Sequence, residues 1–156
     1  MELIRKYGIY VATGLALLGF ILLMSTPAVV SGDNTLVSGI KALFGADVDF
    51  LWYHGHIDPS GWGLTAWILG LLGIVGLVFF CVAPFIKAID LENKLYAFIA
   101  LGVAVLVLAS GICAFGVNCY GWSDTGIGGG WVVGGILLVL AGGLATVDPL
   151  LAVLNK

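Results

Sequence analysis

The chain has 156 residues, of which 61% are hydrophobic and only 10% charged, and its formal net charge at pH 7 is −3. Water-soluble domains carry about 25% charged residues, so this composition excludes a soluble fold. A nucleic-acid-binding protein is also excluded, because the chain has no basic patch to neutralise phosphates. Four stretches contain no Asp, Glu, Lys or Arg: residues 7–32, 59–86, 95–123 and 125–147.

The four uncharged stretches predict transmembrane helices. Each exceeds the roughly 20 apolar residues that cross a hydrocarbon core of ~30 Å. None alternates polar and apolar residues as a barrel strand does, and a helix satisfies its own backbone hydrogen bonds in lipid. We therefore expect an all-α integral membrane four-helix bundle, a single domain over residues 1–156. Its helices are expected at about 7–30, 63–86, 95–116 and 127–147, with a long first outer loop at 31–62.

The first predicted helix follows a basic pair, Arg5 and Lys6, as the apolar region of a signal peptide also does. The apolar run is longer than the ~7–15 residues of that region and lacks a clear cleavage site, so we expect a retained helix. Five basic residues fall on the side of the chain ends, and only Lys41 falls on the other. Because basic residues favour the inner side, both termini are expected in the cytoplasm and the protein in the plasma membrane.

The first half of the outer loop predicts a short amphipathic helix. Apolar residues recur there at helical spacing, at Leu36, Val37, Ile40, Leu43 and Phe44. Gly45 is placed to end such a helix. We expect this segment to lie in the membrane interface or to re-enter the membrane.

The second half of the loop, DFLWYHGHIDPSGWG at residues 49–63, holds both histidines of the chain. His54 and His56 are separated by one residue, so on an extended segment both face the same way, with Asp49, Asp58 or Asp47 near enough to complete a metal shell. A metal site of His54, His56 and Asp58 is one interpretation, and a hydrogen-bonding surface for a partner or for lipid headgroups is another. Ordinary polar residues at the membrane interface are the third. H-x-H lacks the spacing of a known zinc motif, so we predict no metal and no cofactor.

Aromatic side chains crowd the same stretch. Aromatic residues in a polar setting tend to dominate protein interfaces. We therefore expect partner contact through Phe50, Trp52, Tyr53, His54 and Trp62.

Glycines inside the predicted helices indicate close helix packing, because small residues let helices approach in lipid. Gly130 and Gly134 form a GxxxG step, and Gly70 and Gly73 lie in the second helix. We expect these residues to pack helices of one chain, and a face between copies of the chain is the alternative.

The predicted helices contain no ionisable residue, since the fourth ends at 147, just before Pro149, and proline can end a helix at little cost. Ionisable residues inside membrane helices mark ion pathways and proton relays. Their absence argues against a proton-coupled transporter or an ion pump.

Cys113 and Cys119 lie at and just beyond the outer end of the third predicted helix. Six residues of helix rise ~9 Å, which exceeds the usual Cα separation of a disulfide, so a bridge requires the helix to end between them. An oxidising exterior would permit the bridge. The disulfide and two free thiols both stay open.

Residues 13–45, TGLALLGFILLMSTPAVVSGDNTLVSGIKALFG, resemble the start of small bacterial four-helix membrane proteins, in which a first helix ends in a proline before a polar stretch and an SG…FG segment. The topology also resembles the claudin-like tetraspan architecture. That resemblance implies adhesion, barrier formation or support of a larger membrane complex. The claudin loop motif, W then GLW then two cysteines, is absent, with FLW at 50–52 and no cysteine in this loop. No functional residue is therefore carried over.

Catalytic carboxylate pairs, a nucleophile with its base and phosphate-binding loops are missing from the sequence. We expect a non-catalytic scaffold or accessory subunit of a larger membrane complex. It would contact membrane lipids and other membrane subunits, or further copies of itself, through helix faces and the first outer loop. The alternative is an oligomeric pore or transport subunit for a small solute or a lipid. A third class is an enzyme acting on lipid, with His54 and His56 as acid or base.

Overall fold

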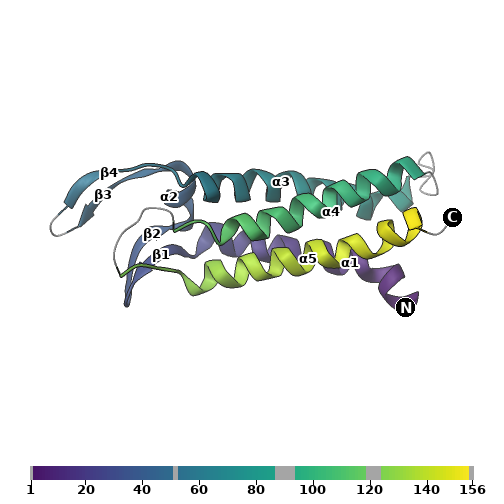
Figure 1. The fold of residues 1–156 in the computed structure, drawn as a ribbon, viewed down its shortest axis with the longest axis horizontal. Coiled ribbons are helices and arrows are strands. Elements are labelled where there is room, and N and C mark those ends of the chain that lie inside the picture. The colour runs from purple at the N-terminus through teal and green to yellow at the C-terminus, as the bar shows by residue number, and fades with distance from the viewer. Residues whose placement is uncertain (1, 51–52, 87–93, 119–123, 155–156) are drawn as a thin grey trace.

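The computed structural model describes residues 2–50, 53–86, 94–118 and 124–154. Four long helices run side by side along the molecule (Figure 1). They are α1 (Glu2–Ser25), α3 (Gly61–Val82), α4 (Lys94–Ala114) and α5 (Gly129–Leu154). Each contains a span long and apolar enough to cross a membrane, which confirms a multi-pass helical membrane protein. Both ends of the chain lie at one end of the bundle, here called the terminal end, and the strands lie at the opposite end, the strand end.

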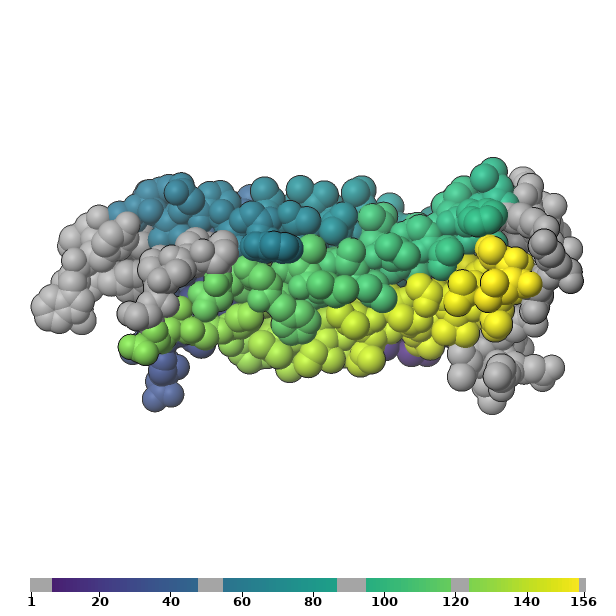
Figure 2. Space-filling view, in the orientation of Figure 1, coloured from purple at the N-terminus to yellow at the C-terminus, as the bar shows by residue number. Residues whose placement is uncertain are grey.

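The helices pack in the order α1, α5, α4, α3, with α1 and α3 less extensively in contact. Figure 2 shows α3, α4 and α5 side by side on one face of the molecule. The residues that are buried between the helices are mostly small, and the large apolar side chains point outward. Buried alanines include Ala12, Ala16, Ala66, Ala104 and Ala141, whereas Leu18, Leu72, Val75, Val105 and Leu140 are exposed. A lipid-facing surface accounts for this distribution, since hydrocarbon does not drive apolar side chains inward.

Glycines set the contact between α3 and α4. A Cβ atom on Gly73 would lie 2.5 Å from Val107 Cγ2, and one on Gly70 would lie 2.8 Å from Ser110 Oγ. The Ser110 hydroxyl donates a hydrogen bond of 2.6 Å to the carbonyl oxygen of Ala66 across the same interface. Both glycines therefore lie at close contacts between α3 and α4 within the chain.

The GxxxG step of α5 lies against the last turns of α1. A Cβ atom on Gly134 would lie 2.8 Å from the carbonyl oxygen of Gly19, and one on Gly130 would lie 2.5 Å from Thr26 Cγ2. This face of α5 is thus used inside the chain rather than left open for a second copy.

The first helix ends at Ser25, earlier than the predicted residue 30, and the chain continues as a strand. Pro27 explains the difference, because proline disfavours the helical conformation in the residue before it. The backbone N–H and the hydroxyl of Thr26 both donate to the carbonyl oxygen of Leu22, at 3.1 and 2.6 Å, and so close the final turn. The β-branched pair Val29 and Val30 then favours an extended chain.

Two small antiparallel sheets occupy the strand end, so the prediction of an all-α chain was incomplete. The first sheet has the order β2-β1-β5, from β1 (Pro27–Ser31), β2 (Asn34–Ser38) and β5 (Gly126–Ile127). The second pairs β3 (Ala46–Phe50) with β4 (Tyr53–Ile57). Because β5 precedes α5 directly, the first sheet ties the starts of β1 and α5 together.

The predicted amphipathic helix is present but shorter, as α2 (Gly39–Phe44). Leu36 and Val37 belong to β2 instead. Gly45 ends the helix with a φ of 74°, as predicted. Ile40 and Phe44, four residues apart, are both partly exposed, and the Phe44 ring meets the ring of Trp67 on α3 edge-on.

The fourth helix begins at Gly129 and continues to Leu154, so the prediction that it ends at 147 before Pro149 was wrong. Proline removes one backbone donor, but membrane helices tolerate this where neighbouring helices surround the site. Pro149 is buried inside the bundle and meets that condition. As a consequence Asp148 lies inside an apolar membrane span, which corrects the expectation that the helices contain no ionisable residue.

Candidate functional site

The β3–β4 hairpin projects past the ends of the helices at the strand end (Figure 1). Its register pairs Ala46 with Ile57, Asp47 with His56, Val48 with Gly55, Asp49 with His54 and Phe50 with Tyr53. Because successive residues of a strand alternate between faces, the register divides the hairpin into two chemically different faces.

The polar face carries two aspartate–histidine pairs in register, Asp47 with His56 and Asp49 with His54. In the first pair, His56 Nδ1 lies 2.9 Å from Asp47 Oδ1. The two side chains are 58% and 94% exposed, and ion pairs this exposed contribute little to stability. The polar face is therefore better explained as a surface with defined hydrogen-bonding groups than as a support for the fold.

The opposite face is apolar by register. It carries Ala46, Val48 and Phe50 on β3 and Tyr53, Gly55 and Ile57 on β4. Ile57, next to the bundle, is buried in the core. Phe50 and Tyr53 form the last pair of the register, at the far end from the bundle. An aromatic pair therefore stands at the most distant part of the hairpin.

The base of the hairpin is fixed to the bundle by specific backbone contacts. Gly45 has a positive φ, and a Cβ atom there would lie 2.8 Å from the carbonyl oxygen of Ile57. The backbone N–H of Ser60 donates to the carbonyl oxygen of Ala42 at 2.7 Å. The buried Ser60 hydroxyl also accepts from the N–H of Gly63 and so caps α3. These contacts set the direction in which the hairpin leaves the membrane helices.

The predicted partner residues that the structure describes belong to two elements, the hairpin and α3. Phe50 and Tyr53 are paired in register, whereas His54 belongs to the polar face. Trp62 lies in the first turn of α3, 55% exposed, with its ring against Gly116 in the turn that follows α4. Trp52 lies outside the described residues, and for Phe50, Tyr53 and His54 the description covers the backbone only.

The predicted metal and disulfide residues are placed only in part. Of the weak metal candidates His54, His56 and Asp58, His56 is paired with Asp47 across the hairpin. Among the residues that the structure describes, no three His, Cys, Asp or Glu side chains are close enough to hold a metal ion together. Cys119 lies outside the described residues, so the disulfide between Cys113 and Cys119 stays a prediction.

The hairpin itself was missed by the sequence reasoning, although a signal was present. ADVDF and YHGHI each alternate polar and apolar residues, and two residues separate them. That pattern is typical of a β-hairpin with a two-residue turn. It would have placed Asp47 and Asp49 opposite the histidines.

The chain matches no known protein-family model and no curated protein. Its function is therefore best inferred from the two features that the fold itself presents, the projecting hairpin and the membrane-spanning bundle.

Proposed function

We propose that this protein is a non-catalytic scaffold or accessory subunit of a larger membrane complex, and that the β3–β4 hairpin is its contact element. One observation carries the proposal. The hairpin extends beyond the helices and has an aspartate–histidine face and an apolar face that ends in an aromatic pair.

Contact with a partner would explain how the projecting β3–β4 hairpin is stabilised. A two-stranded hairpin is only marginally stable in water by itself, and an exposed ion pair adds little. The turn end of the hairpin lies beyond the ends of the helices (Figure 1). A partner surface that covers the apolar face would supply the missing burial, and aromatic residues are enriched at such interfaces.

The charge distribution supports an orientation for this contact. Five of the six basic residues belong to the chain ends and to residues 87–94, where the chain passes from α3 to α4, all on the side of the terminal end. Lys41 is the single basic residue of the loop at 31–62. By the positive-inside rule the termini lie in the cytoplasm and the hairpin faces outward from the plasma membrane. The partner would then be the outer part of another membrane subunit or a further copy of this chain.

The test is quantitative recovery of partners from native membranes. One variant keeps Ala46 and the buried Ile57 and replaces residues 47–56 between them by a short Gly-Ser linker. A matched control changes Asp33 and Asn34 to Ala in the exposed β1–β2 turn, at the same end of the molecule. We expect the linker variant to lose the partners that the wild type and the control recover, while its helical content stays the same. Equal recovery by the linker variant, or a strictly monomeric wild type that recovers nothing, would contradict the proposal.

The alternative of an oligomeric transport subunit is favoured by a different observation. Asp148 lies inside the apolar span Gly129–Leu154, and ionisable residues in membrane spans often mark solute pathways. Flux measurements in proteoliposomes test this function directly. Asp148→Asn should abolish any flux that depends on the carboxylate and leave recovery of hairpin partners unchanged.

A further inference from the structure

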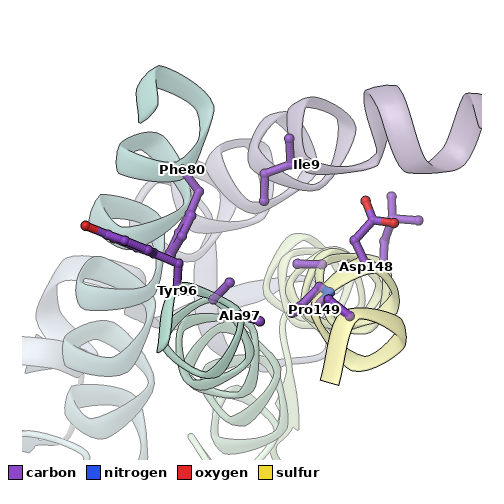
Figure 3. A pocket seen from close by; sticks show the side chains of 10 residues that line it. Ile9, Phe80, Tyr96, Ala97, Asp148 and Pro149 are labelled. Atoms are coloured by element: carbon purple, nitrogen blue, oxygen red, sulfur yellow. The ribbon is translucent and has the colours of Figure 1, made fainter. Parts of the chain in front are cut away.

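A cavity of about 340 Å³ lies among the four long helices at the terminal end (Figure 3). Its walls come from every helix, with Ile9 on α1, Phe80 on α3, Tyr96 on α4 and Asp148 on α5. Ligand sites commonly measure roughly 300–1,000 Å³, so this cavity has room for one small organic molecule. A whole phospholipid with two acyl chains is too large for it.

The cavity exists because alanines stand where larger side chains would fill the bundle. Four of them line it, Ala97, Ala100, Ala145 and Ala152. The space is not enclosed by the helices but opens at the end of the bundle, so a ligand can enter it from outside. Toward the strand end, a contact of 3.2 Å between Thr13 Oγ1 and Cys81 Sγ joins α1 to α3. The space is therefore confined to the last turns of the bundle at the terminal end.

The chemistry of the lining is asymmetric. Figure 3 shows Phe80 and Tyr96 on one side of the cavity and Asp148 on the other. The Tyr96 hydroxyl points away from the space, so this side presents aromatic rings. Asp148 contributes a carboxylate, and one of its two oxygens is buried. Among the residues that line the cavity, Asp148 is the one with a chargeable carboxyl or amino group. A carboxylate has about four acceptor positions, so it can bind a cation in addition to contacts it makes within the chain.

Pro149 adds a second acceptor beside the carboxylate. Proline has no N–H, so it cannot donate the α-helical hydrogen bond to the carbonyl oxygen four residues earlier. That oxygen belongs to Ala145, which also lines the cavity. The Asp148 carboxylate and a carbonyl that lacks its usual helical donor, that of Ala145, lie within about one turn of each other on α5. An ammonium group, which has only donors, matches both.

The depth of the site fits a molecule with a charged end and an apolar body. Asp148 lies six residues before the end of α5 at Leu154, which is about 9 Å at 1.5 Å per residue. The carboxylate is therefore near the boundary of the membrane span, and the alanine-lined space extends from it between the helices.

We propose that this cavity binds a small hydrophobic amine. The protonated amine donates hydrogen bonds to the Asp148 carboxylate and the Ala145 carbonyl oxygen, and the apolar body packs against Ile9 and the Phe80 ring. This binding lies at the opposite end of the bundle from the hairpin and does not depend on the contact function proposed above.

The test compares two probes of one shape, 1-adamantylamine and the neutral 1-adamantanol. The full-length protein is placed in phosphatidylcholine nanodiscs, and binding is measured by isothermal titration, with empty nanodiscs titrated to subtract partition into lipid. We expect saturable binding of one amine per chain. The alcohol should bind at least about tenfold more weakly, since hydrogen bonds to charged groups contribute more than a factor of ten.

Two variants separate the charge of the site from its shape. Asp148→Asn keeps the shape and should remove the preference for the amine over the alcohol. Ala100→Leu keeps the carboxylate and should weaken both probes by filling the space. The control Asp33→Asn removes the same charge from an exposed turn at the strand end and should bind as the wild type does.

Three results would overturn the proposal: no saturable amine binding by the wild type, equal binding of amine and alcohol, or unchanged amine binding by Asp148→Asn. If Asp148→Asn does not fold, the two probes on the wild type and on Ala100→Leu still decide. Unchanged binding of both probes by Ala100→Leu would then place the amine outside this cavity.

Discussion

Two adjacent glycines of α5 offer a stringent test of the helix packing. A Cβ atom on Gly142 would lie 2.5 Å from the backbone nitrogen of Leu108 and 2.7 Å from its Cα, whereas one on Gly143 would meet nothing within 4 Å. The same substitution, to Ala, is therefore a clash at the first position and harmless at the second. Both changes carry the same intrinsic gain, because Ala is about 0.5–1 kcal/mol better than Gly inside a helix.

The magnitude follows from the geometry. Ordinary contact begins at 3.4 Å, so Gly142→Ala requires α4 and α5 to separate locally by about 1 Å, the difference between 3.4 and 2.5 Å. No rotamer change relieves this, because the atoms of Leu108 are backbone. A gap of 0.5–1 Å forfeits about a quarter to a half of each dispersion contact, and overpacking costs typically about 1–3 kcal/mol. After the helix gain, we expect a net loss of about 1–2 kcal/mol, against a gain of up to about 1 kcal/mol for Gly143→Ala.

The assay is reversible unfolding in mixed micelles at rising dodecyl sulfate, followed by tryptophan fluorescence and by circular dichroism. The quantity compared is the free energy of unfolding of the two variants, with the wild type as reference. If Gly142→Ala proves as stable as Gly143→Ala, α4 and α5 do not approach at Leu108 as described, and the packing argument fails.

Three further substitutions test individual contacts. Trp131 is fully buried and its Nε1–H donates to the Ala114 carbonyl oxygen at 2.8 Å, so Trp131→Phe should lower the free energy of unfolding by about 1–3 kcal/mol in the same assay. Ser60→Ala removes the acceptor for the Gly63 N–H at 3.2 Å and should cost about 1 kcal/mol in that assay. Gly45→Ala, at a φ of 74°, should loosen the base of the hairpin, which hydrogen exchange of the β3 and β4 amides would detect as faster exchange. Unchanged exchange there would show that Gly45 does not hold the hairpin in place.

The existence of the four long helices could be predicted because it depends on a local property, the length of an uncharged run. Their ends were less predictable because hydropathy does not record backbone conformation. Residues 28–30 are apolar both in a helix and in β1, and the partner strand β5 lies almost a hundred residues later. At Pro149 the error is opposite, because the predicted helix was too short rather than too long. The packing around Pro149 overrides the local tendency of proline to end a helix.

The two candidate sites, the hairpin and the cavity, also differ in how far the sequence could predict them. The hairpin was readable in principle from alternation in two neighbouring segments, and its register then fixes Asp47 opposite His56. The cavity was not readable, because it depends on alanines and aromatic residues from helices far apart in sequence. Asp148 becomes a candidate binding residue only because α5 continues past it to Leu154, which places its carboxylate within the helix bundle.

The distribution of polar groups along the bundle indicates why the two ends carry separate chemistry. Asp148 is the one Asp, Glu, Lys or Arg within the four described candidate spans, and it lies toward the terminal end. The Asp47–His56 pair lies beyond the helices at the strand end. Between them, α5 alone extends roughly 39 Å at 1.5 Å per residue over its 26 residues, through a core of alanine and glycine. Ligand binding at one end could influence contact at the other only through a shift of whole helices, and close backbone contacts such as Gly134 with Gly19 resist such a shift. We therefore expect amine binding and partner recovery to respond independently to Asp148→Asn and to removal of the hairpin.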